Sequence, residues 1–97
     1  MDYSLFKSVE GQTFHLADFT PDILTLKEVS DKNINGQWYT FSLLFSSNNN
    51  SLSQATYQLS HPELGKLDVF LVPIGKYYPD CDEMVYECVF NLPADDA

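Results

Sequence analysis

The sequence contains no arginine and only five lysines, compared with fourteen acidic residues, which gives a net charge of −9. Nucleic-acid-binding proteins neutralise phosphates with lysine and arginine, and they recognise guanine through the forked guanidinium group of arginine. DNA, RNA and anionic lipid surfaces therefore repel a chain of this charge. We expect neither a nucleic-acid partner nor a membrane partner, whereas a basic protein would be attracted.

Long apolar segments and cysteine motifs are missing as well. No apolar run reaches the ~20 residues that a helix needs to span a bilayer, and the first residues lack the basic and apolar regions of a secretory signal. The two cysteines, Cys81 and Cys88, do not form a Cys-x-x-Cys motif, which is typical of a protein from a reducing compartment. We therefore expect a cytoplasmic protein.

Recognisable catalytic motifs are also absent. The sequence has no Gly-x-Ser-x-Gly nucleophile motif, and its four scattered glycines do not form a phosphate-binding loop. His15 and His61 are too few for a typical zinc site, and His61 precedes Pro62 in a turn where its ring would cap or pack. We expect no enzymatic activity, no cofactor and no metal.

What the sequence does have is the pattern of β-strands. It is 44% apolar and 14% aromatic. Its clearest strand alternates strictly, with four large apolar residues on one face: Tyr39, Phe41, Leu43 and Phe45. Predicted strands cover residues 12–17, 23–30, 37–46, 54–60, 67–74 and 85–91. The strand at 67–74 is apolar on both faces apart from Asp68, which predicts a central position.

The two ends of the chain differ from this pattern. Leu5, Phe6 and Val9 are spaced as on one face of a helix, so we predict a short helix over residues 2–10. Residues 92–97 are predicted to form an acidic tail.

The turns decide the predicted fold class. Asn35-Gly36 is a strong hairpin signal at the end of a polar loop, 31–36. A length of 97 residues corresponds to one domain, residues 1–97. Six strands joined by short polar turns predict a mainly β domain, either an antiparallel six-stranded barrel or a two-layer sandwich, with the short N-terminal helix plugging one open end.

Four segments resemble a small bacterial domain family of unknown function: FSLLF (41–45), QATYQLSHPELG (54–65), FLVPIG (70–75) and YECVFN (86–91). The resemblance implies a small stand-alone bacterial protein, in some cases encoded near phage-tail-like structural genes, and it implies no activity. The family has alanine where this chain has Cys88, which supports a small buried position there.

One loop is not explained by folding. Tyr and Trp beside carboxylates are typical of protein contact surfaces. The predicted contact residues are Tyr77, Tyr78, Pro79, Asp80, Asp82 and Glu83, together with Trp38. The tyrosines could equally stack on a sugar ring, or one could cover a barrel end. The three acidic residues could also offer oxygens to calcium, but they lack the spacing of an EF-hand and fit a solvated turn better.

Three functional hypotheses follow. The first is a non-catalytic protein-binding or assembly module, for example an accessory subunit of a phage-tail-like or other multi-protein particle, with a basic protein or a second copy as partner. The alternative is an acidic inhibitor that imitates nucleic acid in the basic groove of a target, which needs carboxylates arrayed on one face. The third is an enzyme with an unrecognised site, which needs an open pocket with convergent polar groups.

Overall fold

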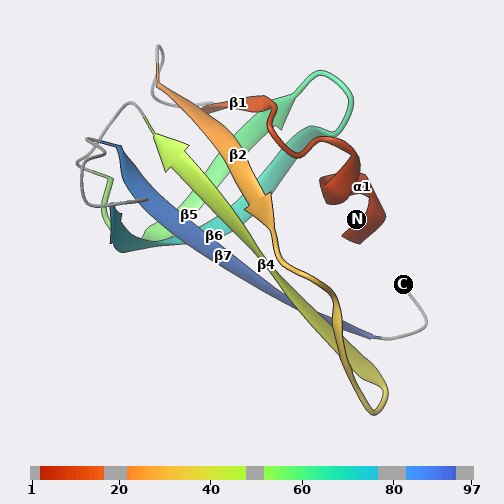
Figure 1. The fold of residues 1–97 in the computed structure, drawn as a ribbon. Helices are drawn as coiled ribbons and strands as arrows, with labels where there is room; N and C mark the ends of the chain where they lie inside the picture. Colours follow the sequence, from red (N-terminus) through yellow and green to blue (C-terminus); the bar gives the residue numbers. More distant parts are fainter. Residues whose placement is uncertain (1–2, 17–21, 48–51, 77–82, 94–97) are drawn as a thin grey trace.

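The chain forms a closed antiparallel barrel of six strands, with one additional strand and one short helix (Figure 1). The computed structural model describes residues 3–16, 22–47, 52–76 and 83–93. The elements are α1 (Tyr3–Ser8), β1 (Thr13–Leu16), β2 (Ile23–Val29), β3 (Asn33–Asn35), β4 (Trp38–Ser47), β5 (Ala55–His61), β6 (Gly65–Lys76) and β7 (Met84–Pro93). No helix in these described stretches has the length and apolar character to cross a membrane.

Strand β4 closes the barrel because it pairs with three other strands. All of β4 pairs with β7, from Trp38 opposite Pro93 to Ser47 opposite Met84. Its second half also pairs with β2, and its first half pairs with β3. The strand order β2-β1-β5-β6-β7-β4-β3, together with the β2–β4 pairing, makes a ring that leaves β3 outside. The fold is therefore the barrel of the two predicted alternatives.

The additional strand β3 lies in the segment predicted as a loop, 31–36. Its three residues pair with the beginning of β4 across a turn formed by Gly36 and Gln37, one position beyond the Asn35-Gly36 signal. Gly36 has a φ of 65°, a left-handed conformation that glycine adopts without strain. The segment is a strand because β4 extends beyond the end of β2 and leaves a free edge for it. In the same way β7 runs on to Pro93, into the predicted acidic tail.

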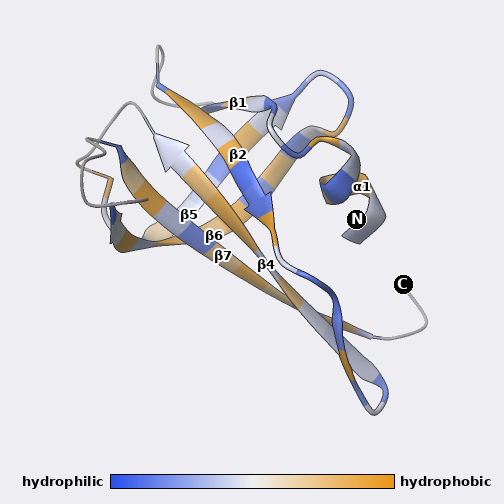
Figure 2. Cartoon of the chain, viewed as in Figure 1, coloured by the Kyte–Doolittle hydropathy of each residue, from blue (hydrophilic) through white to orange (hydrophobic). Residues whose placement is uncertain are grey.

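The core of the barrel follows the alternation of the strands (Figure 2). The inner face of β4 is almost completely buried, with Tyr39, Leu43 and Phe45 at 0% exposure and Phe41 at 3%. Leucine side chains from β1, β2, β5 and β6 complete this core. Burial of each such side chain contributes roughly 1.5–3 kcal/mol to folding, so the inward faces explain why the chain folds.

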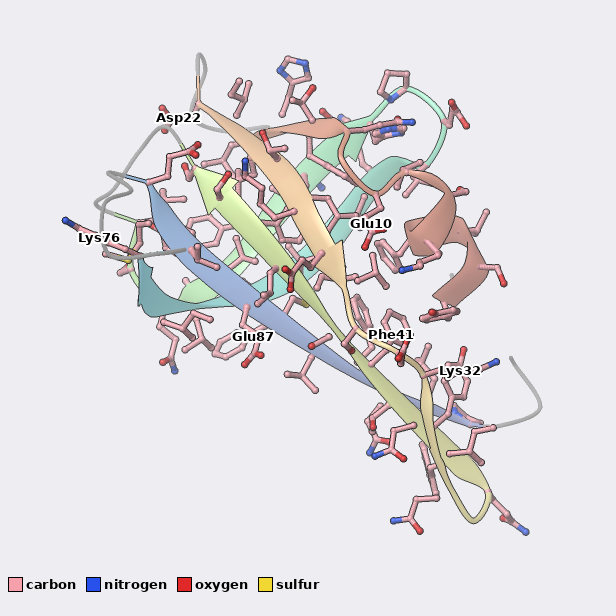
Figure 3. All side chains as sticks on the ribbon, viewed as in Figure 1. Glu10, Asp22, Lys32, Phe41, Lys76 and Glu87 are labelled. Carbon is pink, nitrogen blue, oxygen red and sulfur yellow. The ribbon has the colours of Figure 1, made fainter. Side chains whose placement is uncertain are left out.

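Helix α1 packs at one end of the barrel through aromatic contacts. The ring centroid of Phe6 lies 6.0 Å from that of Phe41 and 5.2 Å from that of Phe90, and Tyr3 meets Phe41 edge to face at 5.4 Å. Figure 3 shows Phe41 between β4 and this helix. A helix of six residues is unstable in isolation, so these contacts hold it in place.

The residues after α1 are hydrogen-bonded to β2. The backbone N–H of Gly11 donates to the carbonyl of Leu26 at 2.7 Å, and the N–H of Leu26 donates to the carbonyl of Gln12 at 2.9 Å. The Glu10 carboxylate accepts a hydrogen bond of 2.7 Å from the N–H of Val29. This hydrogen bond lowers the pKa of Glu10 below its ordinary value, and the neighbouring Lys7 ammonium lowers it further.

Candidate functional site

Part of the sheet projects from the barrel, and we call it the arm: β3, residues 38–42 of β4 and residues 88–93 of β7 (Figure 1). The arm exists because β4 and β7 pair with each other over ten positions, while each pairs with its other barrel neighbour over fewer positions. Strand β2 pairs only with Leu43–Ser47, and β6 pairs only with Met84–Glu87. Beyond those points β4 and β7 continue without the rest of the barrel.

The inner face of the arm turns towards α1. Lys32 Nζ lies 5.2 Å from the ring centroid of Tyr39 and 5.7 Å from that of Tyr3, a cation–π arrangement. Ile34 pairs with Tyr39 and so lies on the same face, but its side chain is 64% exposed. The outer face carries Trp38 and Val89, which are 51% and 63% exposed.

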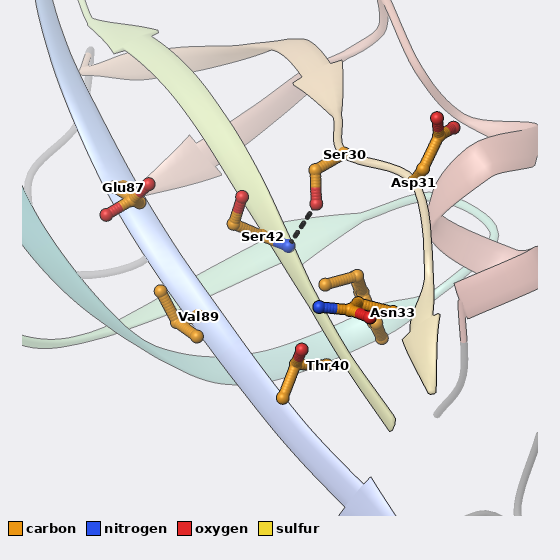
Figure 4. Close-up of a pocket in the computed structure, with 8 residues that line it drawn as sticks. Ser30, Asp31, Asn33, Thr40, Ser42, Glu87 and Val89 are labelled. Atoms are coloured by element: carbon orange, nitrogen blue, oxygen red, sulfur yellow. Dashed lines mark hydrogen bonds between the residues drawn. The ribbon is translucent and has the colours of Figure 1, made fainter. Parts of the chain in front are cut away.

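A shallow hollow of about 330 Å³ lies on the outer face of the arm, where β3, β4 and β7 meet. Its lining side chains include Ser30, Asp31, Thr40, Ser42, Glu87 and Val89. Figure 4 shows Asp31 and Glu87 on opposite sides of the row formed by Ser42 and Thr40. Ser30 is held by two hydrogen bonds: its Oγ accepts from the N–H of Ser42 at 2.7 Å, and its N–H donates to the Ser42 carbonyl at 2.9 Å.

The hollow combines polar and apolar groups. It offers hydroxyl groups, two carboxylates and one exposed valine, and these can bind a polar or basic group. In the parts of the chain that the structure describes, no group of three or more His, Cys, Asp and Glu residues is placed to hold a metal ion.

A second hollow of about 380 Å³ includes His15 and His61 in its lining. His61 is 5% exposed, and both of its ring nitrogens are engaged. Its Nδ1 accepts the backbone N–H of Glu63 at 3.0 Å, so its Nε2 carries the proton and donates to Gln12 Oε1 at 2.7 Å. This histidine caps its turn, as predicted. Its hydrogen bond to Gln12 was not predicted, because the two residues are far apart in the sequence and no local pattern links them.

The predicted contact residues divide between two ends of the molecule. Trp38 begins β4 on the arm, opposite Pro93. Glu83 is exposed just before β7 at the other end of the same ladder, and its carboxylate lies 3.8 Å from Lys27 Nζ. The structure therefore does not bring Trp38 and Glu83 together. The remaining predicted residues lie outside the described part of the chain: Tyr77, Tyr78, Pro79, Asp80 and Asp82.

Sequence reasoning missed the exposed apolar residues near the arm. Strand β6 is central, between β5 and β7, but only its inner face is buried, and Phe70 is 49% exposed. The predicted central position of this strand is confirmed, whereas the exposure of Phe70 was not predicted. Val89 lies on the outer face of β7, and its exposure depends on where β6 leaves β7.

Cys88 marks the boundary between barrel and arm. Its side chain is 3% exposed, in agreement with the predicted small buried position. Burial raises the pKa of its thiol to about 11, against the opposing effect of a hydrogen bond to the backbone of Phe70.

Comparison with known proteins gives a family but no activity. A family model described as "Domain of unknown function (DUF6916)" matches residues 1–90, which include the whole barrel apart from the last residues of β7. No curated protein and no solved structure matches this chain. Because the match covers nearly all of the sequence, the chain belongs to the DUF6916 family, a family of domains whose function is unknown.

Proposed function

We propose that this chain is a non-catalytic protein-binding or assembly module whose partner contacts the arm. The observation that carries the proposal is the exposure of large apolar residues on a projecting part of the sheet: Ile34, Trp38 and Val89 are more than half exposed. Scattered apolar residues on a surface are ordinary. Here they share one protruding element, and none of the three belongs to the buried core.

The physical argument is the burial of these side chains in a complex. Tryptophan is enriched at the centres of protein interfaces, where a large side chain is removed from water. Each Å² of apolar surface that a partner covers contributes about 25 cal/mol, before the cost of association is subtracted. The hollow beside Val89 adds hydroxyl groups and carboxylates that can bind polar groups of the partner.

The proposed role is that of an accessory subunit in a larger multi-protein particle, of the kind found in phage-tail-like structures. A net charge of −9 favours a basic partner over a second copy. The nucleic-acid mimic receives less support, because the described carboxylates are spread over several elements, such as Glu10 after α1, Glu63 between β5 and β6, and Glu87 on β7.

The test is capture of a partner from the native source, followed by light scattering of the purified complex. We expect the double variant Trp38→Ser/Val89→Ser to lose the partner while it keeps the thermal midpoint of the wild type within a few degrees. The matched control is Ile74→Ser, because Ile74 is 52% exposed on β6 in the half that pairs with the start of β7, away from the arm.

A second comparison separates the arm from the predicted loop. The variant Tyr77→Ser/Tyr78→Ser changes residues between Lys76 and Glu83, which flank the barrel end opposite the arm. If this variant loses the partner and Trp38→Ser/Val89→Ser keeps it, the contact surface is the loop and not the arm. A wild-type protein that stays monomeric and captures no specific protein would overturn the proposed function.

A further inference from the structure

Strand β7 has an open backbone edge in the arm. Strand β6 pairs with β7 only through Met84–Glu87, and the earlier part of β6 pairs with β5 instead. From Cys88 to Pro93, β7 has a ladder partner on the β4 side and, among the described residues, none on the other. An open strand edge is a template on which another chain can add a strand.

The hydrogen bonds of β4 show which groups of β4 point away from β7. The N–H and C=O of Ser42 both bond to Ser30, on the side away from β7. In an antiparallel sheet, successive residues of a strand direct these groups to opposite neighbours. Phe41 and Leu43 therefore direct theirs towards β7.

The same alternation identifies the free groups of β7. Phe90 and Cys88 are the register partners of Phe41 and Leu43, so their N–H and C=O groups point to β4. Val89 and Asn91 consequently direct theirs to the open edge, and both residues are exposed. Pro93 has no N–H to donate. The edge thus presents two N–H groups and their carbonyls at the spacing of a β-ladder.

We propose that a partner protein adds an extended segment of alternating basic and apolar residues to this open edge of β7. The inference rests on the proposed protein-binding function and deepens it by naming the chemistry of the partner. It is a case of β-strand addition, in which backbone hydrogen bonds give affinity and alternate side chains give specificity.

The side chains on the outer face select basic residues. Glu87 lies on the same face as Val89, two residues before it, and Figure 3 shows it projecting from β7. Asp68 is exposed on β6, on the face of Phe70 and four residues before Val72, where the pairing of β6 with β7 begins. Lys66 follows on that face, further from Phe70. A lysine or arginine of the added strand can pack its aliphatic chain against Val89 and Phe70. Its charged group then lies on the same face as the carboxylates of Glu87 and Asp68.

The inner face selects apolar residues. Phe90 and Leu92 are half-buried on this side of β7, and Phe90 contacts Phe6 of α1. Side chains of an added strand alternate between the two faces, so the residues between the basic ones would lie beside this aromatic cluster. Alternating basic and apolar residues therefore match both faces at once.

The charge of the chain favours a different protein over a second copy as the occupant. Two copies would bring two net charges of −9 together, and each would place Glu87 near the other's edge. The other free edge of the arm, β3, is less suitable. It has three residues, and of these only Ile34 directs its N–H and C=O outwards, because its neighbours point to β4.

The test uses two capped synthetic peptides, one of alternating lysine and valine and one with glutamate in place of lysine. On ¹⁵N-labelled wild-type protein, we expect the lysine peptide to shift the amide signals of Val89 and Asn91 and to slow their hydrogen exchange. The amide of Phe90, already bonded to β4, should keep its exchange rate. The glutamate peptide should not bind, and added salt should weaken the lysine peptide.

Two matched variants separate the backbone from the side chain. Asn91→Pro removes the outward N–H without removing a bond to β4, and Asn91→Ala keeps that N–H. We expect Asn91→Pro to weaken the lysine peptide about tenfold and Asn91→Ala to leave it nearly unchanged. Equal binding by both variants would overturn the inference, and so would equal binding of the two peptides. If Asn91→Pro does not fold, the exchange rates of the wild type decide alone.

These outcomes are distinct from those of the proposed function. A captured partner that is lost with Trp38→Ser/Val89→Ser but retained by Asn91→Pro leaves the binding function intact and removes strand addition. A dimer that forms at low concentration and disappears in Asn91→Pro assigns the edge to a second copy and overturns the basic partner. A lysine peptide that shifts signals elsewhere, with Val89 and Asn91 unchanged, also overturns the inference.

Discussion

The barrel and the arm both contain the strands β4 and β7, yet the residues of these strands differ between the two regions in burial and in strand pairing. In the barrel half, Leu43 and Phe45 are fully buried, and each strand is paired on both sides. In the arm half, Trp38 and Val89 are more than half exposed, and within the described part of the chain β7 has no ladder partner on the side away from β4. Folding explains the first half completely. In the second half Tyr39 and Phe41 still belong to the core, and the exposed residues are those that are free to serve a contact.

Truncation of a core residue should give the largest contrast between the two halves. Phe45 is completely buried and meets Phe14 edge to face at 5.4 Å. We expect Phe45→Ala to lower the free energy of unfolding by about 3–5 kcal/mol, because it leaves a cavity in the barrel. The control Val89→Ala should change it by less than about 0.5 kcal/mol. Urea unfolding measures both, and similar losses would place Val89 in the core.

Thiol reactivity should change sharply between two adjacent residues. In a Cys81→Ser background, Cys88 is buried, and the pKa of its thiol is raised from 9.0 to about 11. We expect alkylation at pH 8 to be at least about 100-fold slower than for an exposed thiol, because the thiolate is the reacting form. A Val89→Cys variant that also lacks both native cysteines should react like a free thiol. Equal alkylation rates for Cys88 and for the Val89→Cys thiol would contradict the difference in burial between these two positions.

The bond between His61 and Gln12 tests a long-range contact of the barrel. We expect His61→Ala to lower the free energy of unfolding by about 2 kcal/mol, because the backbone N–H of Glu63 and the Gln12 amide lose their partner. His15→Ala is the control, since His15 is exposed on β1. Chemical denaturation compares the two variants. An effect of His15→Ala as large as that of His61→Ala would assign the stability to the second hollow as a whole.

The smallest effect is expected in the pH dependence of stability. The hydrogen bond from Val29 lowers the pKa of Glu10, so the folded state favours the carboxylate. Its contribution is complete above the pKa of Glu10 in the unfolded chain and is lost as the pH falls through the lower pKa of the folded state. We expect Glu10→Gln to flatten this part of the stability profile, measured by denaturation between pH 7 and acid. An unchanged slope would contradict the role of this carboxylate.

The sequence predicted the barrel half well and the arm poorly, for a physical reason. Strict alternation placed the side chains of β4 on their correct faces. In the arm, Asn35-Gly36 indicated the turn between β3 and β4, but the strand β3 itself was predicted as a loop. Alternation does not tell which strands become neighbours or where a ladder stops. The strand β3, the exposure of Phe70 and the open edge beyond Glu87 all depend on those pairings.

The candidate site shows the same division. Trp38 was predicted from its residue type and lies on the arm, whereas Glu83 proved to be at the other end of the ladder. The contact role of the loop from Tyr77 to Asp82 stays a prediction, because that loop lies outside the described residues. Ile34 was not predicted, since a short polar loop gave no indication that it would form a strand.

By itself, the sequence determined the charge, the inward face of each strand and the family, because these depend on residue types and on spacing along the chain. Only the tertiary structure decided that β4 closes a barrel by pairing with β2 and that β6 leaves β7 after Glu87. Many strand edges have a similar pattern along the sequence, so the pattern does not specify which distant strands pair or over how many residues. The short ladder between β6 and β7 produces the open edge of β7 at which we propose that the partner binds.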